Sequence, residues 1–106
     1  MDNFKAVYHM LSALERAMDC AEFDINEIGP EVLGVSRQRW ARYLEMMLDV
    51  GYIRGVTVKQ TITGDLMVEN EDIRITLKGL EYLQENSIMK QIYKAMKGIK
   101  EAVPFV

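Results

Sequence analysis

The stretch DIRITLKGLEYLQENS, residues 72–87, constrains the fold most, because it changes from strand spacing to helix spacing without a loop. Ile73, Ile75 and Leu77 alternate with polar residues at period two, as in a strand with one buried face. From Leu77 onward leucines recur every three residues, which is helical spacing. The hydroxyl of Thr76, at the junction, can accept a hydrogen bond from the first turn of a helix. We therefore predict a strand that passes directly into a helix capped by Thr76.

Gly79 falls in the first turn of this predicted helix. Glycine in a helix is less favourable than alanine by about 1 kcal/mol. A close approach of another backbone segment would explain its presence there.

Three further elements are predicted near the start of the chain. Apolar residues at steps of three and four predict an amphipathic helix over residues 3–19. Residues 22–25 are expected to form a short strand, and Pro30 and Gly34 are typical of the start and the end of a short helix. The predicted buried stripe of the first helix comprises Phe4, Val7, Tyr8, Leu11, Leu14 and Met18.

A longer helix is predicted from residue 37 to about residue 50. Ser36 is a typical helix cap, and Gly51 suits the left-handed residue that follows a helix. The apolar face of this helix carries Trp40, Leu44, Met47 and Leu48, with Tyr43 at its margin. The opposite face carries Gln38, Arg42, Glu45 and Asp49.

The rest of the chain is predicted to form a β-hairpin and two helices. Residues 52–62 alternate like a half-buried strand, and residues 72–76 form the returning strand. Turn-forming residues predict a polar connection between them, which holds Asp65, Glu69, Glu71 and Asp72. The final helix begins at Ser87 and has an apolar stripe of Ile88, Ile92, Met96, Ile99 and Val103, flanked by Met89 and Tyr93. Its outer face carries Lys90, Lys94, Lys97 and Lys100.

This order of elements predicts the α+β class and, within it, a winged helix-turn-helix with a small β-hairpin wing and an additional C-terminal helix. A chain of 106 residues has room for one core. We therefore expect a single winged-helix domain over residues 1–106, in which residues 86–106 form the C-terminal helix and tail. A generic α+β domain with the same order of elements is the alternative.

Two motifs resemble the YjcQ family of small bacterial and prophage proteins. They are GYIRG at residues 51–55 and ITLKGLEYLQENS at residues 75–87. The resemblance covers most of the chain and is firmest between residues 36 and 101. It implies a winged-helix fold, and it supplies no catalytic or ligand-binding residues.

Positive charge is unevenly distributed in this chain, whose net charge is −3. Residues 36–54 carry four Lys and Arg against two Asp and Glu. Arg and Gln near the start of a recognition helix are the side chains that reach guanine and adenine edges. We therefore expect double-stranded DNA as a partner and a function in transcription regulation. The expected contact residues are Arg37, Gln38, Arg39 and Arg42, at bases or phosphates, and Arg54 and Lys59, at the backbone.

Acidic residues oppose DNA binding. Glu45 and Asp49 share the outward face of the longer helix, and the predicted hairpin connection is acidic, so both would approach phosphates. The alternative for the arginines is a solvated surface or pairing with the acidic residues 1–35. The alternative function is a winged-helix module for protein–protein interaction or dimerisation without DNA binding, and the C-terminal helix is the expected place for a homodimer contact. Otherwise that helix packs against the first helix within the monomer.

The sequence contains no pattern for catalysis, a cofactor, a metal or a small-molecule ligand. His9 falls on the outward face of the first helix, and Cys20, which has no second Cys to pair with, is expected to pack in the core. No apolar run reaches the roughly 20 residues that span a bilayer, and the first residues lack the features of a signal peptide. We expect a cytoplasmic protein that is not an enzyme and does not bind a membrane.

Overall fold

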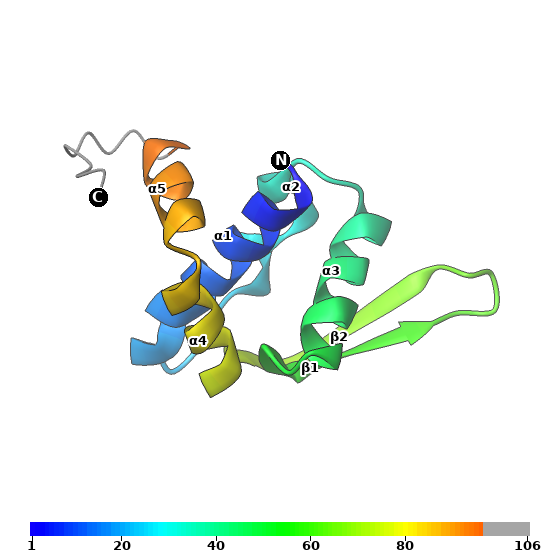
Figure 1. Cartoon of the computed structure of the whole chain (residues 1–106). Coiled ribbons are helices and arrows are strands. Elements are labelled where there is room, and N and C mark those ends of the chain that lie inside the picture. Colours follow the sequence, from blue (N-terminus) through cyan, green and yellow to red (C-terminus); the bar gives the residue numbers. More distant parts are fainter. Residues whose placement is uncertain (97–106) are drawn as a thin grey trace.

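The computed structural model describes residues 1–96, apart from the side chains of Ser87 and Tyr93. In these residues the helical and alternating spacings of the sequence form five α-helices and one antiparallel hairpin. The predicted α+β class is confirmed. Figure 1 shows α1 between α5 and α3, with the hairpin projecting beyond α3. In chain order the elements are α1 (Asn3–Arg16), the 3-10 turns η1 (Ala17–Asp19) and η2 (Ile25–Ile28), α2 (Pro30–Leu33), α3 (Arg37–Asp49), β1 (Ile53–Gln60), β2 (Leu66–Ile75), α4 (Leu77–Glu85) and α5 (Ser87–Met96).

Side-chain caps start three of these helices. The Asp2 carboxylate accepts a hydrogen bond from the N–H of Lys5 at 2.9 Å, which begins α1. The Ser36 hydroxyl accepts one from the N–H of Arg39 at 3.1 Å, as predicted for α3. Each cap satisfies a backbone donor that has no partner within the helix, so the sequence fixes where these helices begin.

The corner between β2 and α4 has the predicted geometry, because α4 begins one residue after β2 ends. The Thr76 hydroxyl accepts from the N–H of Gly79 at 3.2 Å and donates to the carbonyl of Gly51. The N–H of Thr76 donates to the carbonyl of Tyr52 at 2.9 Å. A Cβ at Gly79 would lie 2.5 Å from that Tyr52 oxygen and 2.6 Å from Cγ1 of Ile75, so glycine is required by close packing.

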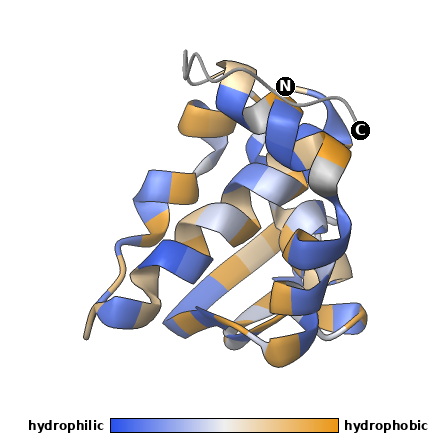
Figure 2. Cartoon of the chain, turned by 60° about the vertical axis from the view of Figure 1, so that its left-hand side comes forward, coloured by the Kyte–Doolittle hydropathy of each residue, from blue (hydrophilic) through white to orange (hydrophobic). Residues whose placement is uncertain are grey.

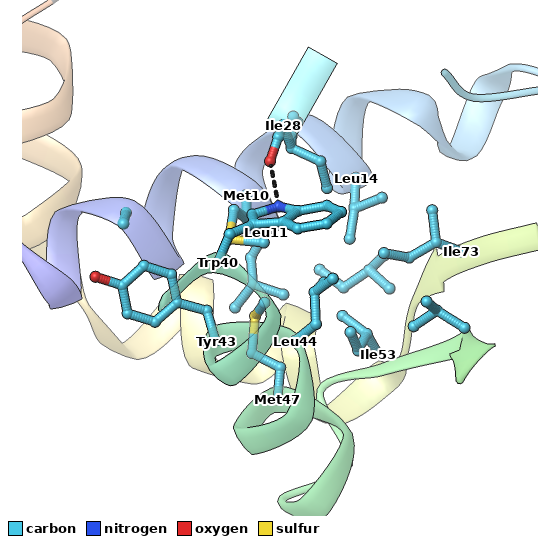
Figure 3. Packing of buried hydrophobic residues seen from close by; sticks show 14 of the residues in the cluster. Met10, Leu11, Leu14, Ile28, Trp40, Tyr43, Leu44, Met47, Ile53 and Ile73 are labelled. Carbon is cyan, nitrogen blue, oxygen red and sulfur yellow. Dashed lines mark hydrogen bonds between the residues drawn. The ribbon is translucent and has the colours of Figure 1, made fainter. Parts of the chain in front are cut away.

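The core lies where α1, α3 and the first part of the hairpin meet (Figure 3). The indole N–H of Trp40 donates to the carbonyl of Ile28 at 2.8 Å, and both residues are buried. This bond fixes the rotation of α3 about its axis, so the opposite face of α3 is turned to solvent. Figure 2 shows hydrophobic and hydrophilic segments alternating along the helices, as amphipathic packing requires. The largest fully buried side chains are those of Tyr43, Met10, Leu11, Leu14, Ile28, Leu33, Leu44 and Ile73.

The hairpin is longer on its returning side than the sequence predicted. β2 begins at Leu66, which pairs with Gln60, and the turn lies between them. Ile62, predicted to be in the first strand, is fully exposed in the turn. The acidic residues at positions 69, 71 and 72 therefore lie in β2 rather than in a connection. Pairing with β1 supplies the hydrogen bonds that make this polar segment a strand.

A bulge interrupts the hairpin between Arg54 and Val56. Gly55 has φ +82°, and a Cβ there would lie 1.9 Å from the carbonyl oxygen of Asp72. Between the pairs Arg54–Arg74 and Val56–Asn70, residues 71–73 of β2 stand opposite Gly55 alone, so the extra residues are on β2. Glycine fits the left-handed conformation at position 55.

The predicted strand at residues 22–25 is wrong. The Asp24 carboxylate accepts from the N–H of Asn26 at 3.0 Å, which starts the 3-10 turn η2 instead. The Arg74 guanidinium donates to the carbonyls of Ala17, Cys20 and Ala21 at 2.7–3.0 Å, and it ties this irregular segment to β2. A local hydrogen bond of the Asp24 side chain thus takes the place of a third strand.

Several apolar residues that were predicted to be buried are exposed. The buried stripe of α1 runs through Ala6 and Met10 instead of Phe4, which is 70% exposed. Met18 is exposed because η1 has the tighter 3-10 winding, which rotates it away from the stripe. Leu77 is also exposed, as is Cys20, whose expected place in the core is therefore wrong. Tyr43, expected at the margin, is fully buried.

The α5 helix lies against α1, as the monomer packing alternative expected (Figure 1). Met89 and Met96 face Lys5 and Tyr8 of α1, whereas Ile88, also predicted to lie in the stripe, is 72% exposed. The other predicted stripe and lysine positions of this helix, Lys97, Ile99, Lys100 and Val103, lie outside the described residues.

Candidate nucleic-acid interface

The first turn of α3 presents its basic side chains to solvent. Arg37, Gln38 and Arg39 follow the Ser36 cap and precede the buried Trp40, so the cap and the core together orient them. Arg42 follows one turn later and is also exposed. The four residues of α3 that were predicted to contact DNA are therefore all exposed and lie near its N-terminal end.

The arginines of α3 differ in how far their charges are neutralised. Arg42 forms an ion pair with Glu45 at 3.0 Å within the helix. The Arg37 guanidinium stacks over the Trp40 ring, 5.4 Å from its centroid. Arg39 donates through Nη1 to the neutral amide oxygen of Asn3 at 3.0 Å. Within residues 1–96, Arg37 and Arg39 therefore keep their full positive charge, and Arg42 has a carboxylate beside it.

The side chain of Gln38 is hydrogen-bonded to the hairpin. Its amide N–H donates to the carbonyl of Gly64 at 3.4 Å, and its amide oxygen accepts from the N–H of Leu66 at 3.1 Å. Both ends of the side chain that was expected to contact a base thus contact the hairpin at its turn. Gln38 holds the hairpin against α3, a contact that joins residues 26 and 28 positions apart.

The two basic residues of β1 lie near its opposite ends. Lys59 pairs in register with Met67, on the strand face opposite the buried Leu66, and its ammonium lies 3.7 Å from the Glu69 carboxylate. Arg54 is exposed near the start of β1, beside the bulge. Exposed ion pairs stabilise little, about 0–1 kcal/mol, but Glu69 reduces the local positive charge at Lys59.

An open hollow of about 330 Å³ lies between the start of α1 and the outward face of α3. Asn3 is central to it, because its amide oxygen accepts from both Arg39 and the hydroxyl of Tyr43, the latter at 2.6 Å. The Tyr43 ring is buried and only its hydroxyl reaches outward (Figure 3). The residues that line the hollow are Asn3, Ser36, Gln38, Arg39, Arg42, Tyr43 and Met46.

Sequence reasoning missed Asn3 and Tyr43 as parts of this site. Asn3 lies 36 positions from Arg39 and 40 from Tyr43. Its local pattern shows only the first residue of a helix, and Tyr43 follows the apolar stripe of α3. No local signal in the sequence marks either residue as a neighbour of the arginines.

Two other features were looked for in the described part of the chain, a cluster of metal ligands and a membrane-spanning helix. Residues 1–96 hold no group of three His, Cys, Asp or Glu side chains that converge as metal ligands do. None of the helices described is long and apolar enough to cross a membrane.

Comparison with known protein families shows which family the chain belongs to. The model of the family described as YjcQ protein matches residues 8–102. The chain belongs to the YjcQ family. The resemblance seen in the sequence is thus confirmed over nearly the whole chain. The YjcQ match includes Arg39 and Tyr43 and begins after Asn3. No curated protein and no solved structure matches this YjcQ chain.

Proposed function

We propose that this YjcQ-family chain is a winged-helix DNA-binding protein, with α3 as the recognition helix and the hairpin as the wing, and that it acts in transcription regulation. The single observation that carries the proposal is the outward first turn of α3, where Arg37 and Arg39 keep their charge. Cationic side chains at the start of an exposed helix are suited to phosphates and guanine edges.

The order of elements supports the winged-helix assignment. α2 and α3 are joined by three residues that include Gly34, which is typical of a helix-turn-helix motif. The hairpin follows α3 directly, and Gln38 fixes its turn beside the first turn of α3. A recognition helix and a wing held in one orientation would meet the duplex together.

Acidic residues limit how the duplex is approached. Glu45 lies one turn beyond Arg42, and Asp49 is exposed at the far end of α3. The helix therefore enters the groove by its first turn alone. Within residues 1–96, Arg37, Arg39 and Arg54 form no ion pair. Three phosphate contacts from these cations would give a log–log dependence of affinity on salt with a slope of about −2.7, at about 0.9 per contact.

The test is fluorescence anisotropy of a labelled mixed-sequence duplex, titrated with the protein at low and near-physiological salt. We expect micromolar binding that weakens steeply with salt, and Arg39→Ala should weaken it. Lys90→Ala is the matched control, because Lys90 is an exposed cation on α5, on the other side of α1. Equal effects of both variants would mean that only net charge matters, and absence of binding at low salt would refute the proposal.

A second variant tests the charge balance of α3. Glu45→Gln frees Arg42 from its ion pair and should raise DNA affinity. Glu81→Gln on α4 makes the same change in net charge at an exposed site away from α3. We expect affinity to rise more for Glu45→Gln than for Glu81→Gln, and equal gains would contradict the assigned surface.

An exposed apolar residue of α5 favours a second candidate function, a homodimer formed through this helix. Ile88 is 72% exposed although the helix is amphipathic. Burying such a side chain against a second copy would be favourable. Sedimentation equilibrium should then show a dimer that Ile88→Glu dissociates. A monomer at all concentrations would exclude this function.

A further inference from the structure

We propose that the hollow between α1 and α3 binds one backbone phosphate of DNA, and that Asn3 is the residue that positions Arg39 for this contact. The inference rests on the proposed function and extends it to a residue of α1. Asn3 belongs to no helix-turn-helix element, since it opens the helix that precedes that motif.

Arg39 is suited to a phosphate because, within residues 1–96, the one hydrogen bond of its guanidinium goes from Nη1 to a neutral acceptor. The amide oxygen of Asn3 at 3.0 Å holds the guanidinium in place without cancelling its charge. A guanidinium has five N–H donors, so four remain for a ligand. Arg presents such donors as a planar fork that matches phosphate oxygens. A fixed and fully charged Arg39 thus differs from Arg42, which Glu45 neutralises.

The position of Asn3 is itself determined by the core. The amide oxygen of Asn3 accepts from the Tyr43 hydroxyl at 2.6 Å, and the Tyr43 ring is 1% exposed. An amide oxygen has two acceptor sites, and Tyr43 and Arg39 supply two donors. Packing therefore fixes Tyr43, Tyr43 fixes Asn3, and Asn3 fixes Arg39. A ligand-binding side chain that is held by well-packed neighbouring residues keeps its geometry before the ligand arrives.

The hollow has room for a phosphate and has two arginines in its lining. Its volume of about 330 Å³ is roughly ten times the share of one water molecule in the liquid. Two arginines, Arg39 and Arg42, line it together with polar side chains, the aromatic Tyr43 and the apolar Met46. It also lies beside the first turn of α3, where the helix dipole favours negative charge.

A double-mutant cycle with the mixed-sequence duplex tests the assignment. Arg39→Ala should lower the affinity and reduce the salt slope by about 0.9, the loss of one phosphate contact. Asn3→Ala should weaken binding by about three- to tenfold in the wild-type background, the range expected for residues in direct contact. In the Arg39→Ala background Asn3→Ala should have no further effect, because Asn3 acts through Arg39.

Asn3→Asp separates positioning from charge. This variant keeps an acceptor beside Arg39 but adds a carboxylate that neutralises it, so binding should weaken, and the salt slope should fall, about as much as in Arg39→Ala. Tyr43→Phe keeps the buried ring, removes the donor to Asn3, and should weaken binding in the same direction. Thermal unfolding of each variant confirms that it is folded.

The outcomes distinguish this inference from the proposed function. If the wild type binds DNA and Arg37→Ala weakens it, but Asn3→Ala acts equally in both backgrounds or Asn3→Asp has no effect, the phosphate site is wrong and DNA binding by α3 stands. If the wild type does not bind duplex DNA at low salt, both are wrong.

Discussion

Gly79→Ala tests the corner between β2 and α4, because two opposing effects meet at this residue. Alanine is favoured over glycine in a helix by about 1 kcal/mol. Against this, the new Cβ would lie 2.5 Å from the Tyr52 carbonyl oxygen and 2.6 Å from Ile75 Cγ1. Carbon atoms pack best at about 3.5–4.0 Å, so neighbouring atoms must move by about 1 Å.

The steric effect should win. Overpacking a filled site costs about 1–3 kcal/mol. The Tyr52 oxygen also accepts the N–H of Thr76 at 2.9 Å, and displacing it weakens a hydrogen bond worth about 1 kcal/mol. After the helix gain of about 1 kcal/mol is subtracted, we expect the free energy of unfolding to fall by about 1–3 kcal/mol. For a domain of this size the melting temperature falls by about 4–8 °C per kcal/mol.

Urea denaturation followed by circular dichroism measures this loss. Glu81→Ala, at an exposed position of the same helix, is the control and should change stability by less than about 0.5 kcal/mol. A Gly79→Ala protein as stable as the wild type, or more stable, would refute the reasoning, because helix propensity would then outweigh the close approach of the backbone.

Three further changes have definite expected outcomes. Trp40→Phe leaves the buried Ile28 carbonyl without its donor and should lower the free energy of unfolding by about 1–3 kcal/mol in urea; a loss below about 0.5 kcal/mol would contradict the role of this bond. The backbone N–H that Asp2 accepts lowers the pKa of its carboxyl below 3.8, so the stabilisation is present above that value and lost as the pH falls through the folded pKa. Asp2→Ala should therefore lower the melting temperature at neutral pH and not at about pH 2, and an equal difference at both would exclude the charged cap. Gly55→Ala places a Cβ 1.9 Å from the Asp72 carbonyl oxygen at φ +82° and should cause the largest loss of the set, measured by circular dichroism; a normally folded variant would show that the bulge can rearrange.

The candidate site was predictable in part. The exposed arginines of α3 followed from the Ser36 cap and the Trp40 stripe, because both signals act within one turn of the helix. The contacts of each arginine could not be predicted from the sequence. Asn3 contacts Arg39, which is 36 positions away, and Gln38 contacts the hairpin, 26 and 28 positions away. No pattern of residue types marks such pairs.

The buried faces were predicted less well than the elements themselves. Large apolar side chains favoured Phe4 as a core residue, yet the stripe of α1 that packs contains the small Ala6, which lets neighbouring elements approach closely. The strand predicted at residues 22–25 lost to a local hydrogen bond of the Asp24 side chain. In both cases the choice lay between faces or conformations that the sequence allows.

The sequence by itself determined where α3 and α4 begin, that a strand leads directly into α4 at Thr76, and that the chain resembles its family. These features depend on caps, glycines and periodicities that act over a few neighbouring residues. Only the tertiary structure decided the length and register of the hairpin, the exposed Phe4, and the link from Tyr43 through Asn3 to Arg39. These depend on which distant segments pack together, because a hydrogen bond between remote residues forms only after the core has fixed the distance between them.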